Sequence, residues 1–125
     1  MQPYERLEAW RASDALAKDV FRSTAAWPTI ERFGLVSQTR RAALSAAVNI
    51  VEGSARRRSR AWRAYLDIAT GSLAETGYLI RFAAEVGVCC PADAQRLLNL
   101  QTSAARPTTA LRRSLSPPKP ALPPG

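Results

Sequence analysis

Large apolar residues recur in this chain at helical spacing, over segments too long for strands. Between residues 7 and 25 they fall three, four or six positions apart, and a longer pattern of the same kind runs over residues 62–86. Such spacing places apolar side chains on one face of a helix. Runs rich in valine and isoleucine, which favour strands, are nearly absent. The chain is therefore predicted to be all-α.

Glycine and proline divide the first half of the pattern. A first helix is predicted over residues 7–25, followed by a connector over residues 26–34, because Pro28 disfavours helical geometry in the residue before it. A second helix is predicted over residues 35–51 with Gly53 as its C-terminal cap.

The second half holds two more helices. Ser59 is a suitable N-cap for a third helix, which extends to Gly87, and Pro91 is a good first-turn residue for a fourth. Pro107 is expected to kink or break the fourth helix, because proline removes a backbone donor and clashes with the preceding turn. Four helices with short connections form an antiparallel up-down four-helix bundle.

The length and composition suit one domain. A chain of 125 residues that is 46% hydrophobic can bury a single core, and we assign the bundle to residues 1–115. Residues 116–125 contain five prolines and little to bury, which predicts a disordered or polyproline-like tail. No apolar run approaches the roughly 20 residues that span a bilayer, and no signal-peptide pattern is present. We therefore expect a cytoplasmic protein with no membrane partner.

The residue types of common active sites are missing. The chain has no histidine, which excludes Ser-His-Asp triads, Cys-His pairs and HExxH zinc sites. Neither of the glycine-rich phosphate-binding motifs occurs. The two cysteines, Cys89 and Cys90, are adjacent, a poor geometry for a structural disulfide, and are interpreted as small residues at a helix boundary. We expect no enzymatic activity, no cofactor and no metal.

Arginine is concentrated in the middle of the chain. The formal net charge is +8, from 18 basic and 10 acidic residues. Between residues 40 and 63, one acidic residue accompanies seven arginines, which are Arg40, Arg41, Arg56, Arg57, Arg58, Arg60 and Arg63. Such a cluster favours polyanions such as RNA or DNA, and a solvated helix face is the equally weighted alternative. Trp62 and Tyr65 lie among these arginines and would stack on bases if exposed, but aromatic residues three apart on a helix are expected to face the core.

A line of polar residues accompanies the second and third helices. Its members, here called the polar seam, are Gln38, Ser45, Asn49, Glu52, Ser72 and Glu75. A core-facing stripe is normally apolar at such positions, so the seam is interpreted as a hydrogen-bond network that fixes register or oligomeric state. The less favoured alternative treats Glu52 and Glu75 as an acid–base or metal pair, although no histidine is present to complete a Glu-x-x-His bundle site.

These residues resemble a known family. The run from Leu35 to Ser45, followed by Asn49 to Gly53, resembles the L-x-S-Q-x-R-R-A-x-x-S-x-x-x-N-I-x-E-G signature of bacterial four-helix-bundle proteins encoded in intervening sequences of large-subunit ribosomal RNA genes. The third-helix pattern of that family is matched by Tyr65, Leu66, Ala69, Gly71, Ser72, Leu73 and Glu75, and the likeness covers residues 5–88.

The resemblance implies a bundle protomer in a ring-like homopentamer with a basic surface, and a structural or assembly role for the polar seam. The chain is also similar to accessory proteins of diversity-generating retroelements, which associate with nucleic acid and a reverse transcriptase. Together with the arginines, the resemblance predicts a non-enzymatic oligomer that binds RNA or DNA without strong sequence preference. The alternative is a protein-interaction scaffold with no direct nucleic-acid contact.

Overall fold

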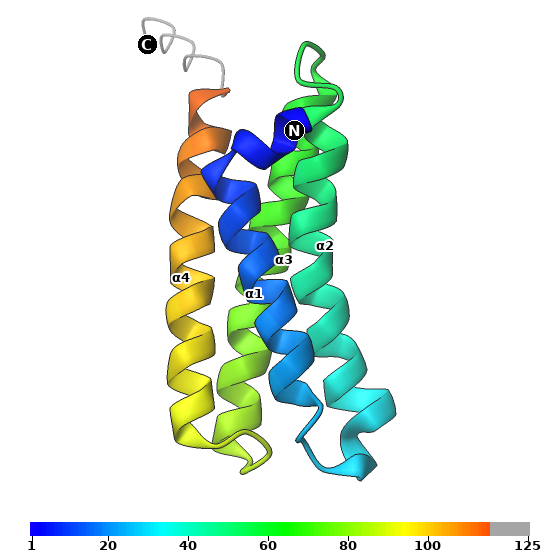
Figure 1. Ribbon diagram of the computed structural model, residues 1–125, viewed down its shortest axis with the longest axis vertical. Helices are drawn as coiled ribbons and strands as arrows, with labels where there is room; N and C mark the ends of the chain where they lie inside the picture. The colour runs from blue at the N-terminus through cyan, green and yellow to red at the C-terminus, as the bar shows by residue number, and fades with distance from the viewer. Residues whose placement is uncertain (116–125) are drawn as a thin grey trace, which may run out of the picture.

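The computed structural model describes residues 1–115, which form four long helices packed side by side in an antiparallel bundle (Figure 1). In chain order these are α1 (Glu8–Thr24), α2 (Ser37–Ser54), α3 (Ala61–Glu85) and α4 (Pro91–Ser114). The described part of the chain contains no strand. The predicted all-α four-helix bundle is confirmed, and the predicted tail at residues 116–125 lies outside the described residues.

Two apolar clusters fill the bundle. The larger one is centred on large side chains from α1, α3 and α4, at most 1% exposed: Leu16, Val20, Leu73, Ile80 and Leu97. The smaller one joins Ile50 of α2 to Trp62 and Leu66 of α3. Burying a leucine or isoleucine side chain stabilises a fold by about 1.5–3 kcal/mol. The apolar spacing in the sequence therefore identified much of the core, but Phe21, Ile68 and Phe82, which belong to the same patterns, are 41–51% exposed.

Gly53 lies inside α2, which ends at Ser54, so the prediction that it caps the helix is wrong. A Cβ atom added at Gly53 would lie 2.4 Å from Cε3 of Trp62 and 2.8 Å from Cβ of Tyr65. The missing side chain lets α3 approach the backbone of α2. Gly53 therefore serves the packing of two helices rather than the ending of one.

The ends of α3 lie close to the predicted residues. The N-cap residue is Arg60, which makes no side-chain capping hydrogen bond, so the prediction of Ser59 as the N-cap is wrong by one residue. Ser59 still contributes at this helix start, because its Oγ accepts a 3.2 Å hydrogen bond from the backbone N–H of Ala61. The helix itself ends at Glu85, and Gly87 has a φ of 81°, in the left-handed region that favours glycine.

Helix α4 is unbroken where the sequence predicted a kink or a break. It continues through Pro107 to Ser114. The carbonyl that loses its helical hydrogen bond belongs to Ser103, four residues earlier, and Ser103 is exposed. On the inner side, the hydroxyl of Thr108 donates a 2.8 Å hydrogen bond to the carbonyl of Ala104. Because Ser103 is exposed, water can satisfy the freed carbonyl, which accounts for the tolerance of proline at this position.

The connection between α1 and α2 contains less irregular structure than predicted. After Trp27 it forms a 3-10 turn at Thr29–Glu31 and a π-helical turn at Arg32–Val36, which leads directly into α2. Ile30 and Phe33 in these turns are 89% and 91% exposed. The predicted connector is therefore present, but its second half is already helical.

One arginine ties α1 to α4. Nε of Arg96 lies 3.0 Å from Oδ2 of Asp19, and Nη2 of Arg96 donates a 2.7 Å hydrogen bond to Oγ of Ser23. Nη1 of Arg96 also lies 2.7 Å from Oδ1 of Asp93, and this contact lowers the pKa of the Asp93 carboxyl below its ordinary value. The pair of carboxylates fixes the guanidinium between the two helices.

The two cysteines occupy the predicted helix boundary. Cys89 is buried in the larger cluster, where desolvation raises the pKa of its thiol, and Cys90 is the exposed N-cap residue of α4. Among residues 1–115, no helix combines the length and the apolar character needed to cross a membrane.

Candidate nucleic-acid interface

The N-terminal residues, the α2–α3 loop and the end of α4 lie at one end of the bundle (Figure 1). The short 3-10 helix η1 (Pro3–Arg6) leads into α1 beside the loop. This arrangement follows from the up-down order, because two antiparallel helices separate the chain start from the loop. Residues some fifty positions apart in sequence are therefore neighbours at this end.

The α2–α3 loop carries the densest positive charge in the molecule. Arg56, Arg57, Arg58 and Arg60 are exposed, and Arg63 in the first turn of α3 is half-buried. The loop is shaped by its own backbone: the amide of Ser59 donates to the carbonyl of Arg56 at 2.9 Å, and the Ser59 hydroxyl donates to the same carbonyl at 2.8 Å. Within residues 1–115, no carboxylate forms an ion pair with any of these five arginines.

Arg56 differs from its neighbours in direction. Its Nη1 donates a 3.1 Å hydrogen bond to the carbonyl of Glu52, and its guanidinium lies 5.3 Å from the ring centroid of Tyr65. Tyr65 is half-buried beneath it, and Trp62 is only 5% exposed. Trp62 packs in the smaller cluster, in agreement with the prediction that it faces the core, whereas Tyr65 belongs to neither cluster and lies under the guanidinium of Arg56.

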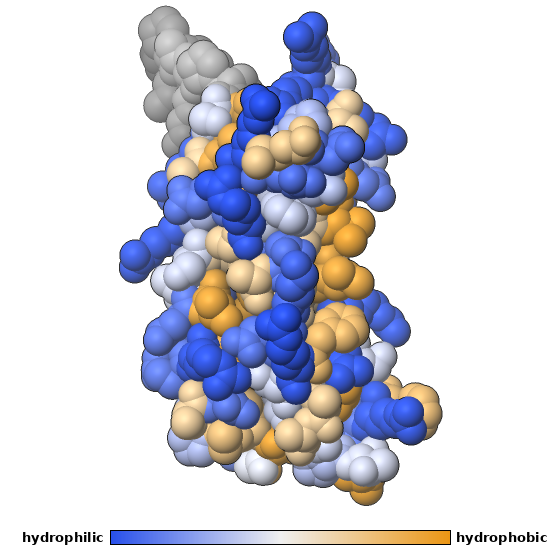
Figure 2. Space-filling model, viewed as in Figure 1, coloured by the Kyte–Doolittle hydropathy of each residue, from blue (hydrophilic) through white to orange (hydrophobic). Residues whose placement is uncertain are grey.

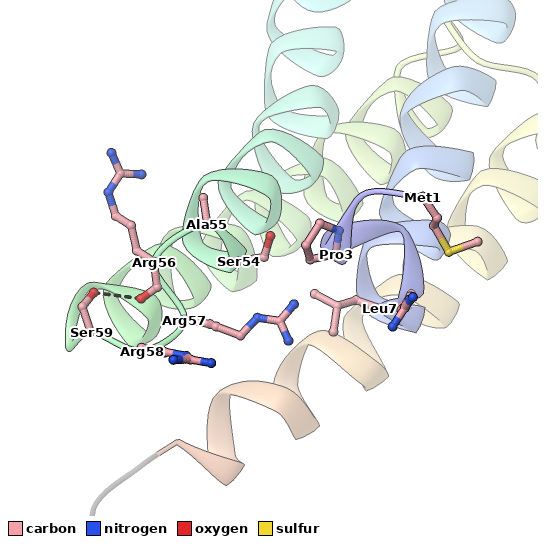
Figure 3. A pocket seen from close by; sticks show the side chains of 10 residues that line it. Met1, Pro3, Leu7, Ser54, Ala55, Arg56, Arg57, Arg58 and Ser59 are labelled. Carbon is pink, nitrogen blue, oxygen red and sulfur yellow. Dashed lines mark hydrogen bonds between the residues drawn. The ribbon is translucent and has the colours of Figure 1, made fainter.

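A hollow of about 790 Å³ lies between the N-terminal residues and the loop (Figure 3). Its cationic lining consists of Arg6, Arg56, Arg57 and Arg58, and its apolar lining of Met1, Pro3, Leu7 and Ala55. Figure 3 shows Arg57 reaching from the loop across the hollow toward Leu7, while Arg56 points away from it. None of the described residues that line the hollow is acidic.

A second hollow, of about 540 Å³, lies on the other side of Arg57 and Ser59, which line both. It adds Arg60 and Arg63 to the arginine surface and is also lined by Leu115. The two hollows together place the loop arginines on a continuous surface at this end of the bundle.

Arg6 was not among the residues predicted from the sequence. Nothing in its local pattern distinguishes it from other exposed arginines, because its position beside the loop depends on the folded bundle. The one available signal was the up-down order itself, which places the chain start and the α2–α3 loop at the same end.

Arg40 and Arg41 lie far from the loop arginines. Both are near the start of α2, and the 18-residue helix spans roughly 27 Å. Nε of Arg40 donates a 2.8 Å hydrogen bond to Oγ1 of Thr24, and its guanidinium lies 4.8 Å from the ring centroid of Phe21. Arg40 therefore joins α2 to α1, and the seven predicted arginines divide into a group of five at one end and a pair at the other.

Three members of the polar seam form a small network. Oγ of Ser45 lies 2.9 Å from Oγ of Ser72 across α2 and α3, and the side-chain amide of Asn49 donates to the Ser45 carbonyl at 2.8 Å and to its hydroxyl at 3.1 Å. The other three members, Gln38, Glu52 and Glu75, are exposed. The network thus joins the two central helices at one level.

The structure separates the two carboxylates of the seam. Ser45 faces Ser72 in the antiparallel pair, which sets Glu52 level with the first turns of α3, about ten residues before Glu75. Ten residues correspond to roughly 15 Å along a helix. Glu52 and Glu75 therefore do not meet at one site. Among the described residues, no three histidine, cysteine or acidic side chains are grouped so that they could hold a metal ion.

An exposed apolar face runs along α2 and α3. Its members are 42–64% exposed: Leu44 and Val48 of α2, with Ile68, Tyr78 and Phe82 of α3. Figure 2 shows hydrophobic residues gathering along the α2 side of the bundle, while hydrophilic residues dominate the end that carries the loop. The polar surface thus lies mainly at the loop end of the bundle, and the apolar surface lies along its α2 side.

A model of a protein family described as 23S rRNA-intervening sequence protein matches residues 5–109 of the chain. The chain belongs to this family. The match includes α1, α2, α3 and most of α4, so it extends the likeness seen at residues 5–88 into the last helix. No curated protein matches the chain.

In this member of the family, the signature residues of α2 make identifiable structural contacts. Ser45 and Asn49 build the network with α3, Arg40 joins α2 to α1, and Gly53 admits Trp62. These contacts hold the bundle together within one chain. Of the exposed loop arginines, Arg56 also contacts both α2 and α3, through the Glu52 carbonyl and the Tyr65 ring.

Proposed function

We propose that this protein is a non-enzymatic, oligomeric helical bundle that binds nucleic acid through the arginine surface at the α2–α3 loop. The observation that carries the proposal is that five arginines are gathered there without a carboxylate partner among residues 1–115. Gathering like charges is unfavourable for the isolated chain. A polyanion relieves that repulsion and releases its counterions on binding.

A binding series with fluorescent single- and double-stranded RNA and DNA at several salt concentrations tests this proposal. With four phosphate contacts, affinity should fall roughly 50- to 150-fold between about 50 and 200 mM salt. A variant with Arg56, Arg57, Arg58 and Arg60 changed to Ala should lose most of this binding. Absent or salt-insensitive binding by the folded native protein would contradict the proposal.

The exposed apolar face supports the oligomeric part of the proposal. Contiguous apolar patches of this kind commonly mark protein–protein contacts, and the family resemblance favours a homopentamer. Ile68→Glu places a charge on this face, next to Val48, and should lower the molar mass measured by light scattering. Ala15→Glu, at an exposed position of α1, adds the same charge outside this face and is the control. A native chain that is monomeric at all concentrations would contradict self-association.

The same apolar face favours one alternative, a protein-interaction scaffold that makes no direct contact with nucleic acid. Here the partner is another protein, and the arginines serve solubility and contacts between subunits. Pull-down from nuclease-treated extract separates the two proposals. A defined protein that is retained after nuclease treatment, and lost with Ile68→Glu, favours the scaffold.

A further inference from the structure

The hollow between the N-terminal residues and the α2–α3 loop combines two kinds of surface. Pro3 and Leu7 supply apolar contacts on one side, and Arg57 and Arg58 supply positive charge from the loop (Figure 3). Its volume of about 790 Å³ falls within the range of small-molecule sites, roughly 300–1,000 Å³. A phosphate group needs only the cationic part. The apolar part suits a ligand that carries a flat apolar group next to its negative charge.

An unpaired nucleotide has this combination, and a base pair inside a duplex does not. Bases in a duplex are stacked and paired, so a protein reaches only their edges and the phosphates. Bases of a single strand are free to turn outward and stack on an aromatic ring or on the plane of an arginine guanidinium. No aromatic residue is among the described residues that line this hollow, so an arginine guanidinium is the planar group there on which a base can stack.

We propose that this hollow receives one unstacked base of a single-stranded nucleic acid, with Arg57 over one face of the base and Leu7 against the other. Arg6 and Arg58 bind the phosphates on either side. Arg57 is placed for this role because it crosses the hollow toward Leu7 and also lines the second hollow. The inference rests on the proposed function, since the same arginines supply the charge.

The second hollow gives the strand a path. It shares Arg57 and Ser59 with the first and continues the positive surface to Arg60 and Arg63. The nucleotide next to the inserted base therefore meets further arginines, and consecutive phosphates are bound without a reading of sequence. Tolerance of sequence together with a preference for single strands is typical of proteins that stack bases on such platforms.

A comparison of two probes of equal charge tests this proposal on the native chain. One is a fluorescent oligothymidylate of about 12 nucleotides, and the other is the same strand with its bases removed. The proposal predicts about tenfold tighter binding of the strand that carries bases, the effect of stacking one base. Equal binding of the two strands would overturn the proposal and leave the proposed function standing. Binding of neither would refute the proposed function together with it.

A variant that fills the hollow locates the base. Ala55 is exposed and lines the hollow, so Ala55→Leu occupies apolar space there without removing a charge. It should abolish the preference for oligothymidylate and leave the affinity for the strand without bases unchanged. Ala92→Leu, at an exposed position in the first turn of α4 at the opposite end, is the matched control and should bind as the native chain does. If Ala55→Leu keeps the full preference, the base does not enter this hollow.

Discussion

Replacing Gly53 by Ala should destabilise the bundle even though alanine is the better helix former. The added Cβ would lie 2.4 and 2.5 Å from two ring carbons of Trp62 and 2.8 Å from Cβ of Tyr65, distances at which something must shift. Trp62 is 5% exposed and packed on all sides, so α3 itself has to move. Overpacking of this kind costs about 1–3 kcal/mol, and the steepness of these contacts suggests the upper end. The gain in helix propensity is about 1 kcal/mol, which leaves a net loss of about 2 kcal/mol.

Gly71 offers a matched control on α3. It is exposed within the helix, and a Cβ added there would meet no atom within 4 Å. Gly71→Ala should therefore stabilise the protein by about 1 kcal/mol through helix propensity alone. Both variants replace a glycine by alanine. Their free energies of unfolding should differ by about 3 kcal/mol, with Gly53→Ala below the native value and Gly71→Ala above it.

Urea unfolding followed by far-UV circular dichroism measures both variants. It should be repeated at two protein concentrations, because self-association makes apparent stability depend on concentration. Thermal melts should separate the two variants by about 10 °C. If Gly53→Ala is as stable as Gly71→Ala, the close approach of Trp62 to α2 does not determine the role of this glycine, and the packing explanation is refuted.

Two further predictions concern the α1–α4 contact and the cysteines. Arg96 lowers the pKa of Asp93 below 3.8, so this contact stabilises the fold above that pH, and its contribution is lost as the pH falls through the lower pKa of the folded state. The native protein should therefore lose stability more steeply below about pH 4 than Arg96→Met does. Superimposable acid-unfolding curves of the two proteins would exclude the contact. Burial raises the pKa of the Cys89 thiol, whereas Cys90 is exposed. A thiol reagent should therefore modify Cys90 rapidly and Cys89 only on unfolding. Equal rates of modification would show that Cys89 is accessible in the folded protein.

The fold was predictable because the apolar periodicity of this chain is long and regular. Residues such as Leu16, Leu73 and Leu97 lie in the core as their spacing predicted. Two local signals misled for the same reason, which is that their effect depends on tertiary position. The sequence indicates that Gly53 is a helix cap, but the residue that requires a glycine there is Trp62, which belongs to another helix. Pro107 is tolerated at a position where the carbonyl it frees belongs to an exposed residue, Ser103.

The candidate site was only partly predictable. Five of the seven arginines lie close together because they are close in sequence, at or beside the α2–α3 loop. Arg40 shares the same local composition, yet it binds Thr24 and Phe21 of α1, a contact that depends on helix packing. The hollow could not be predicted from the sequence, because Arg6 and Leu7 lie beside the loop only in the folded bundle.

Under the proposed function, nucleic acid binds at the loop end of the bundle and not to positive charge in general. Two variants of equal charge test it. One replaces Arg56, Arg57, Arg58 and Arg60 by Ala. The other replaces four exposed arginines that lie toward the opposite end, and these are Arg22, Arg32, Arg41 and Arg81.

The measurement is the slope of log affinity for single-stranded RNA against log salt concentration, for native protein and both variants. With Arg57 stacked on the base, the other three replaced arginines are available for phosphates, and their loss should make the slope shallower by about 2 in the loop variant. The variant altered at the opposite end should keep the native slope. Equal loss of slope in both variants would contradict a site at the α2–α3 loop, because it would show that net charge alone determines binding.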